Sequence, residues 1–242
     1  MKTAFISDIH GNATALEAVL ADIGRKQADR IVVLGDLCYR GPEPKKSLDL
    51  VRNLNTDVIR GNADDWIYRG VRAGEVPRQN LDIMREEQQW TLDRLTAEDV
   101  EYLGHLPAEI TVGLTENITV HGFHATPDSV FEPVQPNEPD EVLEDKLMKK
   151  QESDIYLYGH IHHPYVRHIK GKCVANLGSV GLPFDGLNQA SYLIAEGDGS
   201  QFNVGIHRVK YDIEKVKNQL KAADYPNLEF LSGTIERGSL PQ

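Results

Sequence analysis

The chain opens on MKTAFISDIHGN, residues 1–12, where an apolar β-forming run stops abruptly at Ser7 and Asp8. A short apolar run that ends at a polar cluster is typical of a buried strand that reaches a functional edge of its sheet. Four later runs stop in the same way, at Gly35-Asp36, Gly61-Asn62, His121-Gly122 and Gly159-His160. The sequence therefore predicts several buried strands whose ends carry polar side chains.

Two amphipathic segments separate the first three of these strands. Asn12 is a plausible N-cap for a helix that follows it and closes near Gly24. Pro42 and Pro44 lead into a second helix, in which Leu48 begins the apolar face. The order strand, helix, strand, helix, strand favours a layered fold in which helices cover the faces of a sheet.

Residues 65–106 depart from this alternation of strands and helices, because they are rich in Arg, Glu and Gln and have apolar residues at helical spacing. They are predicted to form a helical cap inserted into a single domain that spans residues 1–242. After the insertion the pattern predicts a strand pair over 109–120, a charged helix over 139–150, three further strands and one last helix that contains Ile213, Val216 and Leu220.

Composition excludes several classes of protein. The formal net charge of -11, from 26 Lys and Arg against 37 Asp and Glu, argues against an extended nucleic-acid-binding face. Cys38 and Cys173 are the two cysteines and form no CxxC pattern, so a disulfide framework is not expected and a reducing cytoplasm fits best. No apolar run has the length of a signal peptide or a membrane span, so no membrane partner is expected.

The polar clusters share a chemistry that suits divalent cations. Each offers a carboxylate oxygen, an amide oxygen or an imidazole nitrogen, and none contains cysteine. Taken alone, one such fragment binds metal in roughly one case in five, given the false-positive rate of short motifs. Loops beyond the ends of parallel strands gather at one edge of a sheet, so all five together predict a metal site.

In this order the clusters, SDIHGN, LGDLCYRGPEP, RGNADDW, VHGFHATP and YGHIHHP, resemble the motifs of the calcineurin-like metallophosphoesterase superfamily, and in particular its small single-chain prokaryotic members. The resemblance spans roughly residues 1–195. It implies an α/β fold of the α+β sandwich type, with mixed β-sheets packed face to face and flanked by helices. It also implies two divalent metal ions that activate a bridging hydroxide for attack on phosphorus.

Site residues carry over by motif. One ion would be held by Asp8, His10 and His162, and the other by Asn62, His121 and His160, with Asp36 bridging them. Asp64 would orient a ligand or the attacking group without binding metal. Mn²⁺ is expected, while Fe, Zn²⁺, Co²⁺ and Ni²⁺ suit the same ligands, so availability would decide.

Two positions depart from the pattern of the family. Ala63 stands where many members have a His that protonates the leaving group, so we expect either that His124, or Asp64 through water, replaces it or that the leaving group needs no proton. Phe184 stands where relatives often carry a phosphate-binding Arg, a role that we expect Arg40 to assume.

The expected function is hydrolysis of a phosphate ester or anhydride of a small molecule, namely a phosphodiester, a nucleotide or a dinucleoside polyphosphate. A protein Ser/Thr phosphatase is the alternative among enzymes, and a non-catalytic metal-binding scaffold is the alternative outside them. The chain has no GxxxxGK[ST], HExxH or GxSxG motif, which argues against nucleoside triphosphatases, zincins and serine hydrolases. The native substrate, the metals and the oligomeric state stay open.

Overall fold

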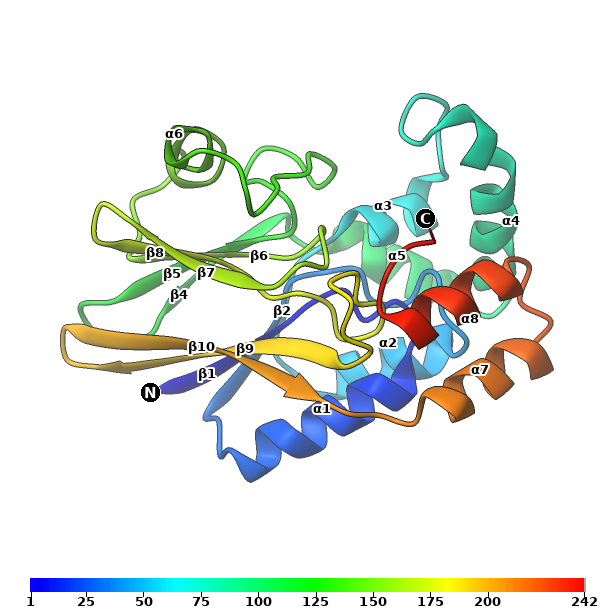
Figure 1. Ribbon diagram of the computed structural model, residues 1–242, viewed down its shortest axis with the longest axis horizontal. Coiled ribbons are helices and arrows are strands. Elements are labelled where there is room, and N and C mark those ends of the chain that lie inside the picture. Colours follow the sequence, from blue (N-terminus) through cyan, green and yellow to red (C-terminus); the bar gives the residue numbers. More distant parts are fainter. Residues whose placement is uncertain (242) are drawn as a thin grey trace.

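Two five-stranded mixed sheets pack face to face in the computed structural model, which describes residues 1–241 (Figure 1). The first sheet, in the order β10-β9-β1-β2-β3, contains β1 (Lys2–Ile6), β2 (Arg30–Val33), β3 (Asp57–Val58), β9 (Ala190–Asp198) and β10 (Gln201–Val209). The second sheet, in the order β4-β5-β6-β8-β7, contains β4 (Glu109–Gly113), β5 (Thr119–Phe123), β6 (Ile155–Tyr158), β7 (Tyr165–Ile169) and β8 (Lys172–Asn176). The predicted sandwich of mixed sheets is confirmed.

Apolar side chains fill the space between the sheets. Phe5 and Leu193 from the first sheet and Val120 and Leu157 from the second are fully buried in one cluster. The outer face of the first sheet packs on α1 (Ala13–Arg25) and α2 (Pro44–Asn53), and that of the second on α6 (Asp140–Leu143) with the π-helical turn η2 (Glu144–Met148). This four-layer arrangement buries both faces of central strands such as β1 and β6, which explains why these strands are short apolar runs.

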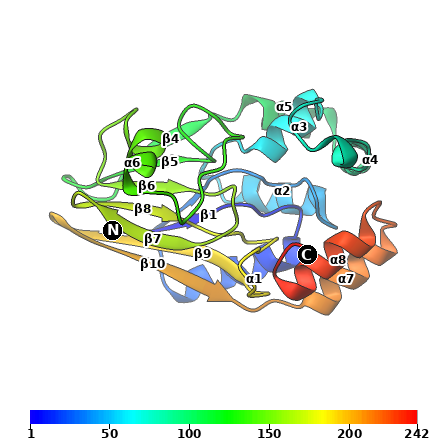
Figure 2. The same cartoon turned by 45° about the horizontal axis from the view of Figure 1, so that its top comes forward.

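The remaining helices gather beyond one end of the sheets (Figures 1 and 2). They are α3 (Asn62–Arg69), the 3₁₀ turn η1 (Arg78–Asn80), α4 (Leu81–Leu92), α5 (Ala97–His105), α7 (Ile213–Ala222) and α8 (Leu228–Arg237). Strands β1, β2 and β3 run parallel to one another, as do β5, β6 and β8. The loops that follow β1, β2, β5 and β6 therefore carry the polar clusters to this end of the molecule.

Side-chain hydrogen bonds of Asn12 explain where helix α1 begins. The Asn12 side chain accepts a hydrogen bond from the Ala15 N–H at 3.0 Å and so caps α1, as predicted. Its amide also donates to the Gly181 carbonyl at 3.0 Å, which ties the start of α1 to the loop that follows β8. The cap therefore fixes two segments that flank the polar clusters.

Two elements, β7 and α8, were not predicted from the sequence. Strand β7 lies at the edge of its sheet, where four of its five residues stay partly or fully exposed and give no apolar alternation. Helix α8 was also missed, so the prediction that the helix around Val216 is the last one is wrong. The centre of α8 reads Ser232-Gly233-Thr234, three residues of low helix propensity, and packing of Leu231 and Ile235 stabilises it instead.

Within residues 1–241, no helix combines the length and apolar character needed to cross a bilayer.

Candidate metal centre

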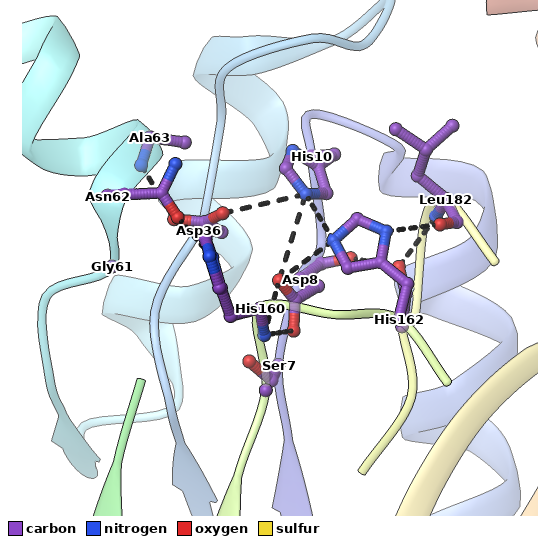
Figure 3. A network of polar contacts seen from close by, with 12 residues as sticks. Ser7, Asp8, His10, Asp36, Gly61, Asn62, Ala63, His160, His162 and Leu182 are labelled. Carbon is purple, nitrogen blue, oxygen red and sulfur yellow. Dashed lines mark hydrogen bonds and ion pairs between the residues drawn. The ribbon is translucent and has the colours of Figure 1, made fainter. Parts of the chain in front are cut away.

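The backbone at the strand ends adopts a conformation that non-glycine residues rarely accept. Asp8, His10, Asp36, His160 and His162 have φ between 49° and 68°. Such residues cost free energy and are retained where the surrounding structure holds them for function. Here each turn directs a carboxylate or an imidazole toward one point beyond the two sheets (Figure 3).

Two glycines allow the chain to approach these side chains closely. A Cβ on Gly61 would lie 2.1 Å from Asp36 Oδ1, and one on Gly159 would lie 2.4 Å from Asp8 Oδ2. Both distances are too short for any side chain. The glycines in the GN and GH motifs are therefore explained by contact with the carboxylates.

Gly61→Ala should weaken metal binding at least about tenfold, because its methyl group displaces the Asp36 carboxylate, and supporting residues around metal sites typically contribute 10–100-fold to affinity. Competition with a fluorescent chelator measures this. Gly24→Ala is the matched control: it lies in α1 with nothing within 4 Å of the added Cβ, so metal affinity should stay unchanged. Equal affinities for both variants would contradict the placement of Asp36.

The first group of side chains consists of Asp8, His10 and His162, which can offer one ligand atom each within 4.8 Å of one another. His162 Nε2 lies 3.0 Å from Asp8 Oδ1 and 3.1 Å from His10 Nε2. Asp36 Oδ2 lies 3.6 Å from His10 Nε2, which brings the predicted bridging carboxylate to this group (Figure 3). All three side chains are 6% exposed or less.

The second group adjoins it on the far side of Asp36. His124 Nε2 lies 3.4 Å from Asp36 Oδ2 and 3.0 Å from Asn62 Oδ1. Asn62 Oδ1 also lies 2.7 Å from His160 Nδ1. Asp8, Asp36 and His124 form a second set whose ligand atoms lie within 4.8 Å of one another. Two neighbouring clusters of donors thus share the carboxylates Asp8 and Asp36.

Backbone carbonyls fix the orientation of three of the imidazoles. His10 Nδ1 donates to the Tyr39 carbonyl at 2.9 Å, His124 Nδ1 to the Leu34 carbonyl at 2.8 Å, and His162 Nδ1 to the Leu182 carbonyl at 2.5 Å. In their neutral forms all three rings therefore present an Nε2 lone pair to the centre of the site. Such lone pairs of His10 and His162, 3.1 Å apart, cannot bond to each other, and a cation between them resolves the conflict. This arrangement of imidazole nitrogens is therefore suited to binding a metal ion.

Burial and charge act in opposite directions on these groups. Burial would raise the pKa of Asp8, but His162, His124 and His10 outweigh it and hold that pKa well below its usual range. Burial lowers the pKa of His10 to about 4 and that of His160 to about 4. For His124 burial is outweighed by Asp36 and Asp8, which raise its pKa to about 10. The carboxylates thus stay charged and attract a positive partner, either a proton or a metal ion.

Asp64 supports the loops and does not face the ligand groups. Its carboxylate accepts from the N–H groups of Asp36 at 2.8 Å, Leu37 at 2.9 Å and Gly61 at 2.9 Å. It is fully buried, and burial together with the neighbouring Asp36 raises its pKa to about 7. The carboxylate therefore positions the Asp36 turn and the start of α3 by holding their backbone.

The loop between β8 and β9 is a supporting element that the sequence analysis did not assign residue by residue. Ser179 Oγ donates to the Asp8 carbonyl at 2.7 Å, and the Gly181 N–H donates to the same carbonyl at 3.0 Å. The Leu182 carbonyl orients His162. Ser179 is fully buried there. Its supporting role depends on this tertiary contact, which a single sequence does not show.

His121 does not join the cluster. Its Nε2 pairs with Glu109 Oε2 at 3.0 Å, and its ring packs against Phe123 and Tyr156 on the outer face of the second sheet. Residue 121 lies in the middle of β5, where its neighbours Val120 and Gly122 face the other sheet. The first residue after β5 is His124, and it occupies the place that the sequence analysis gave to His121.

The structure shows the surroundings of the two residues that were expected to transfer protons. His124 was expected to protonate the leaving group in place of the missing histidine, and its Nε2 lies 3.0 Å from Asn62 Oδ1 and 3.4 Å from Asp36 Oδ2, within a group that could hold a metal ion. Asp64 was the alternative, but three backbone N–H groups occupy its oxygens and no part of it is exposed. Ala63, at 1% exposure, offers only a backbone N–H, which donates to Asp36 Oδ1 at 2.8 Å.

Arg40 lies beside the ligand groups and not among them. It follows Tyr39, whose carbonyl orients His10, and its Nε lies 3.2 Å from Oε2 of the buried Glu87 on α4. Phe184, on the loop after β8, stacks on the His162 ring with centroids 4.3 Å apart. Phe184 therefore contacts the first group directly, whereas the guanidinium of Arg40 pairs with Glu87.

The family model for the calcineurin-like phosphoesterase superfamily domain matches residues 1–200. An uncharacterised protein of Methanocaldococcus jannaschii is 32% identical over 243 residues, covering 90% of this chain and 93% of that protein. Phosphodiesterase YfcE of Escherichia coli is 26% identical over 208 residues, covering 82% and 89%.

Among solved structures, a metallophosphoesterase from Sphaerobacter thermophilus superposes with a TM-score of 0.79 at 29% identity, covering 98% of this chain and 99% of that one. The match of the family model, the similarity along nearly the whole chain and the shared architecture agree with the motif resemblance. The chain belongs to the calcineurin-like phosphoesterase superfamily.

Proposed function

We propose that this protein binds two divalent metal ions and hydrolyses a phosphate ester or anhydride of a small molecule. The observation that carries the proposal is the convergence of seven side chains from four loops and one helix start on one buried point. Asp8, His10 and His162 would hold one ion, Asn62, His124 and His160 the other, and Asp36 would bridge them.

These residues suit phosphoryl chemistry. Two adjacent divalent ions, once bound, lower the pKa of a water molecule and neutralise the charge that develops on phosphorus-bound oxygens. The protein contributes a rigid donor set: Asp36 offsets the repulsion between the cations, and the carbonyl-bound imidazoles keep their Nε2 atoms in place. Arg40, which follows the residue whose carbonyl holds His10, would supply a positive charge for binding the substrate.

A small substrate fits the surroundings of the site. Helices α3, α4 and α5 stand beyond the ends of the sheets (Figure 2), and we assign to residues 65–106 the role of a cap in a single domain. Such a cap narrows access for a folded phosphoprotein, which places a protein Ser/Thr phosphatase second. YfcE, a relative named as a phosphodiesterase, supports a phosphodiester or nucleotide substrate.

The proposal is tested by a screen of metal-reconstituted protein against phosphodiesters, phosphomonoesters, dinucleoside polyphosphates and a phosphopeptide. Turnover of a small-molecule ester or anhydride above that of the phosphopeptide is expected. A preference for the phosphopeptide would establish the alternative phosphatase. Metal binding without turnover of any compound would establish a non-catalytic scaffold.

The rate should depend strongly on the leaving group, because Ala63 carries no imidazole, His124 lies against Asn62 and backbone N–H groups occupy the oxygens of Asp64. A general acid contributes about 10²–10⁴-fold to a reaction. Hydrolysis of p-nitrophenyl esters, or of anhydrides that release a nucleotide phosphate, should therefore exceed that of matched alkyl esters by at least about a hundredfold. A series of phosphodiesters with graded leaving-group pKa measures this, and a flat dependence would require a proton donor.

Mn²⁺ is the proposed native metal, with Fe, Zn²⁺, Co²⁺ and Ni²⁺ as chemically acceptable substitutes for an N/O donor set. The cytoplasm is the proposed compartment, since Cys38 and Cys173 are both free and buried. Metal analysis of protein purified without added metal decides the first point.

A further inference from the structure

A cavity of about 620 Å³ lies beside the metal centre and belongs to none of the ligand groups. Its walls come from the loop after β2, the start of α4, the loop after β8, and α8 with the residues after it, as the residues Arg40, Asn80, Ile83, Met84, Phe184, Asn227, Phe230, Leu240 and Pro241 show. Both α4 and α8 lie at the end of the sheets that carries the site (Figures 1 and 2). The volume is within the usual range for a small-molecule site.

Two contacts connect this cavity to the metal ligands. Phe184 lines it and stacks on the ring of His162 at 4.3 Å. Arg40 lines it and adjoins Tyr39, whose carbonyl holds His10. A molecule whose phosphate lies at the metals would therefore extend its remaining part into this space.

The lining combines two aromatic rings with one cation. Phe184 and Phe230 are both partly exposed, although large apolar side chains of this size are usually buried. The Arg40 guanidinium lies 5.3 Å from the centre of the Phe230 ring and is 19% exposed. Aromatic faces with an adjacent guanidinium suit a flat, electron-rich ring that is attached to a phosphate.

Two asparagines supply hydrogen-bonding groups that the fold does not use. Asn80 precedes α4 and Asn227 precedes α8, and at both positions the side chain makes no capping hydrogen bond. Asparagine at an N-cap ordinarily accepts from the backbone of the first turn. Both side chains instead line the cavity, where amide groups can bind the polar edge of a heterocycle.

From this lining we propose that the cavity binds the heteroaromatic base of a nucleoside phosphate, with the base against Phe230 and Phe184 and its edge facing Asn80 and Asn227. The proposal rests on the proposed function and specifies it: the substrate is a nucleoside phosphodiester or anhydride. The aromatic pair selects a ring without selecting one base, because every base has a stacking face. Arg40 then binds a phosphate oxygen on the side of the cavity that faces the first group of ligands.

Kinetics on two esters test this binding mode. Thymidine 5′-(p-nitrophenyl phosphate) and methyl p-nitrophenyl phosphate have the same leaving group and the same reacting phosphodiester, and differ in the nucleoside. The metal-loaded protein should prefer the thymidine ester by about tenfold or more in kcat/KM, since stacking of one base contributes about 1–3 kcal/mol. Phe230→Ala should abolish most of this preference, because it lowers kcat/KM for the thymidine ester by a larger factor than for the methyl ester.

Phe202→Ala is the matched control, because Phe202 is also partly buried but lines a separate cavity with Met1 and Lys2. The Phe202→Ala variant should retain the preference for the thymidine ester. Asn80→Ala provides a second variant at an exposed position, in case Phe230→Ala lowers stability, and should reduce the preference several-fold. Circular dichroism confirms that each variant is folded.

Saturation-transfer NMR with thymidine and with ribose gives a readout without turnover. Thymidine should show transfer that persists when the metals are chelated and is lost in Phe230→Ala, whereas ribose should show none. Equal rates for both esters with no thymidine transfer would overturn the inference while the phosphoesterase function stands. Thymidine transfer without hydrolysis of either ester would support the cavity and overturn the proposed function.

Discussion

Asp36→Asn is expected to lower kcat/KM on a phosphodiester by on the order of 10³-fold or more and to reduce the number of bound metal ions. Asp36 is one of the two carboxylates that the groups share, and it lies 3.6 Å from His10 Nε2 and 3.4 Å from His124 Nε2. Asparagine keeps the shape of this side chain and removes its charge, so two cations are left without the anion that offsets their repulsion. Steady-state kinetics and metal analysis of the purified variant measure both effects.

Asp57→Asn controls for the loss of one negative charge. Asp57 lies on β3, is 44% exposed and pairs with Arg30, so its contribution to stability is at most about 1 kcal/mol and its effect on turnover should be absent. An Asp36→Asn protein that retained two ions and more than a tenth of the activity would contradict the bridging role.

His124→Ala and His121→Ala form the second decisive pair. His124→Ala should remove the second metal ion and lower activity by on the order of 10²–10³-fold, because it deletes a donor that lies 3.0 Å from Asn62 Oδ1. His121→Ala should retain both ions and near-normal turnover. It should lower the free energy of unfolding by about 1–3 kcal/mol, since it leaves Glu109 without its partner and a hole beside Phe123.

Isothermal titration with Mn²⁺ and denaturant unfolding separate the two variants. The reverse outcome, with metal lost in His121→Ala and retained in His124→Ala, would restore the assignment made from sequence. A loss of metal in both variants with intact circular dichroism would mean that the outer face of β5 also supports the site.

Much of the fold could be predicted because buried strands and polar loop starts leave a direct pattern in the sequence. The runs before Asp8, Asp36 and His160 are uninterrupted β-formers, which indicated a sheet covered on both faces. The site followed from the same pattern, because loops beyond parallel strands meet at one edge. The resemblance to the family then added a proposed assignment of these residues to two metal ions.

Other features could not be predicted because they depend on position within a strand or on tertiary contacts. His121 and His124 both belong to the VHGFHATP segment, and only the true end of β5 at Phe123 decides which of them leaves the sheet. An error of three residues in a strand boundary, ordinary for sequence patterns, led to His121 being expected at the position beside Asn62 that His124 occupies. The cavity beside Arg40 requires α8, which lacks a clear sequence signature.

The central claim is that the two groups of side chains hold two metal ions, and anomalous diffraction from a Mn²⁺-containing crystal tests it most directly. The account predicts two peaks, roughly 3.5–4 Å apart as in other two-metal sites. One peak should contact Asp8, His10 and His162, the other Asn62, His124 and His160, and Asp36 should contact both. A crystal grown with Mn²⁺ that showed no peak at Asp36, or a peak at His121, would contradict it.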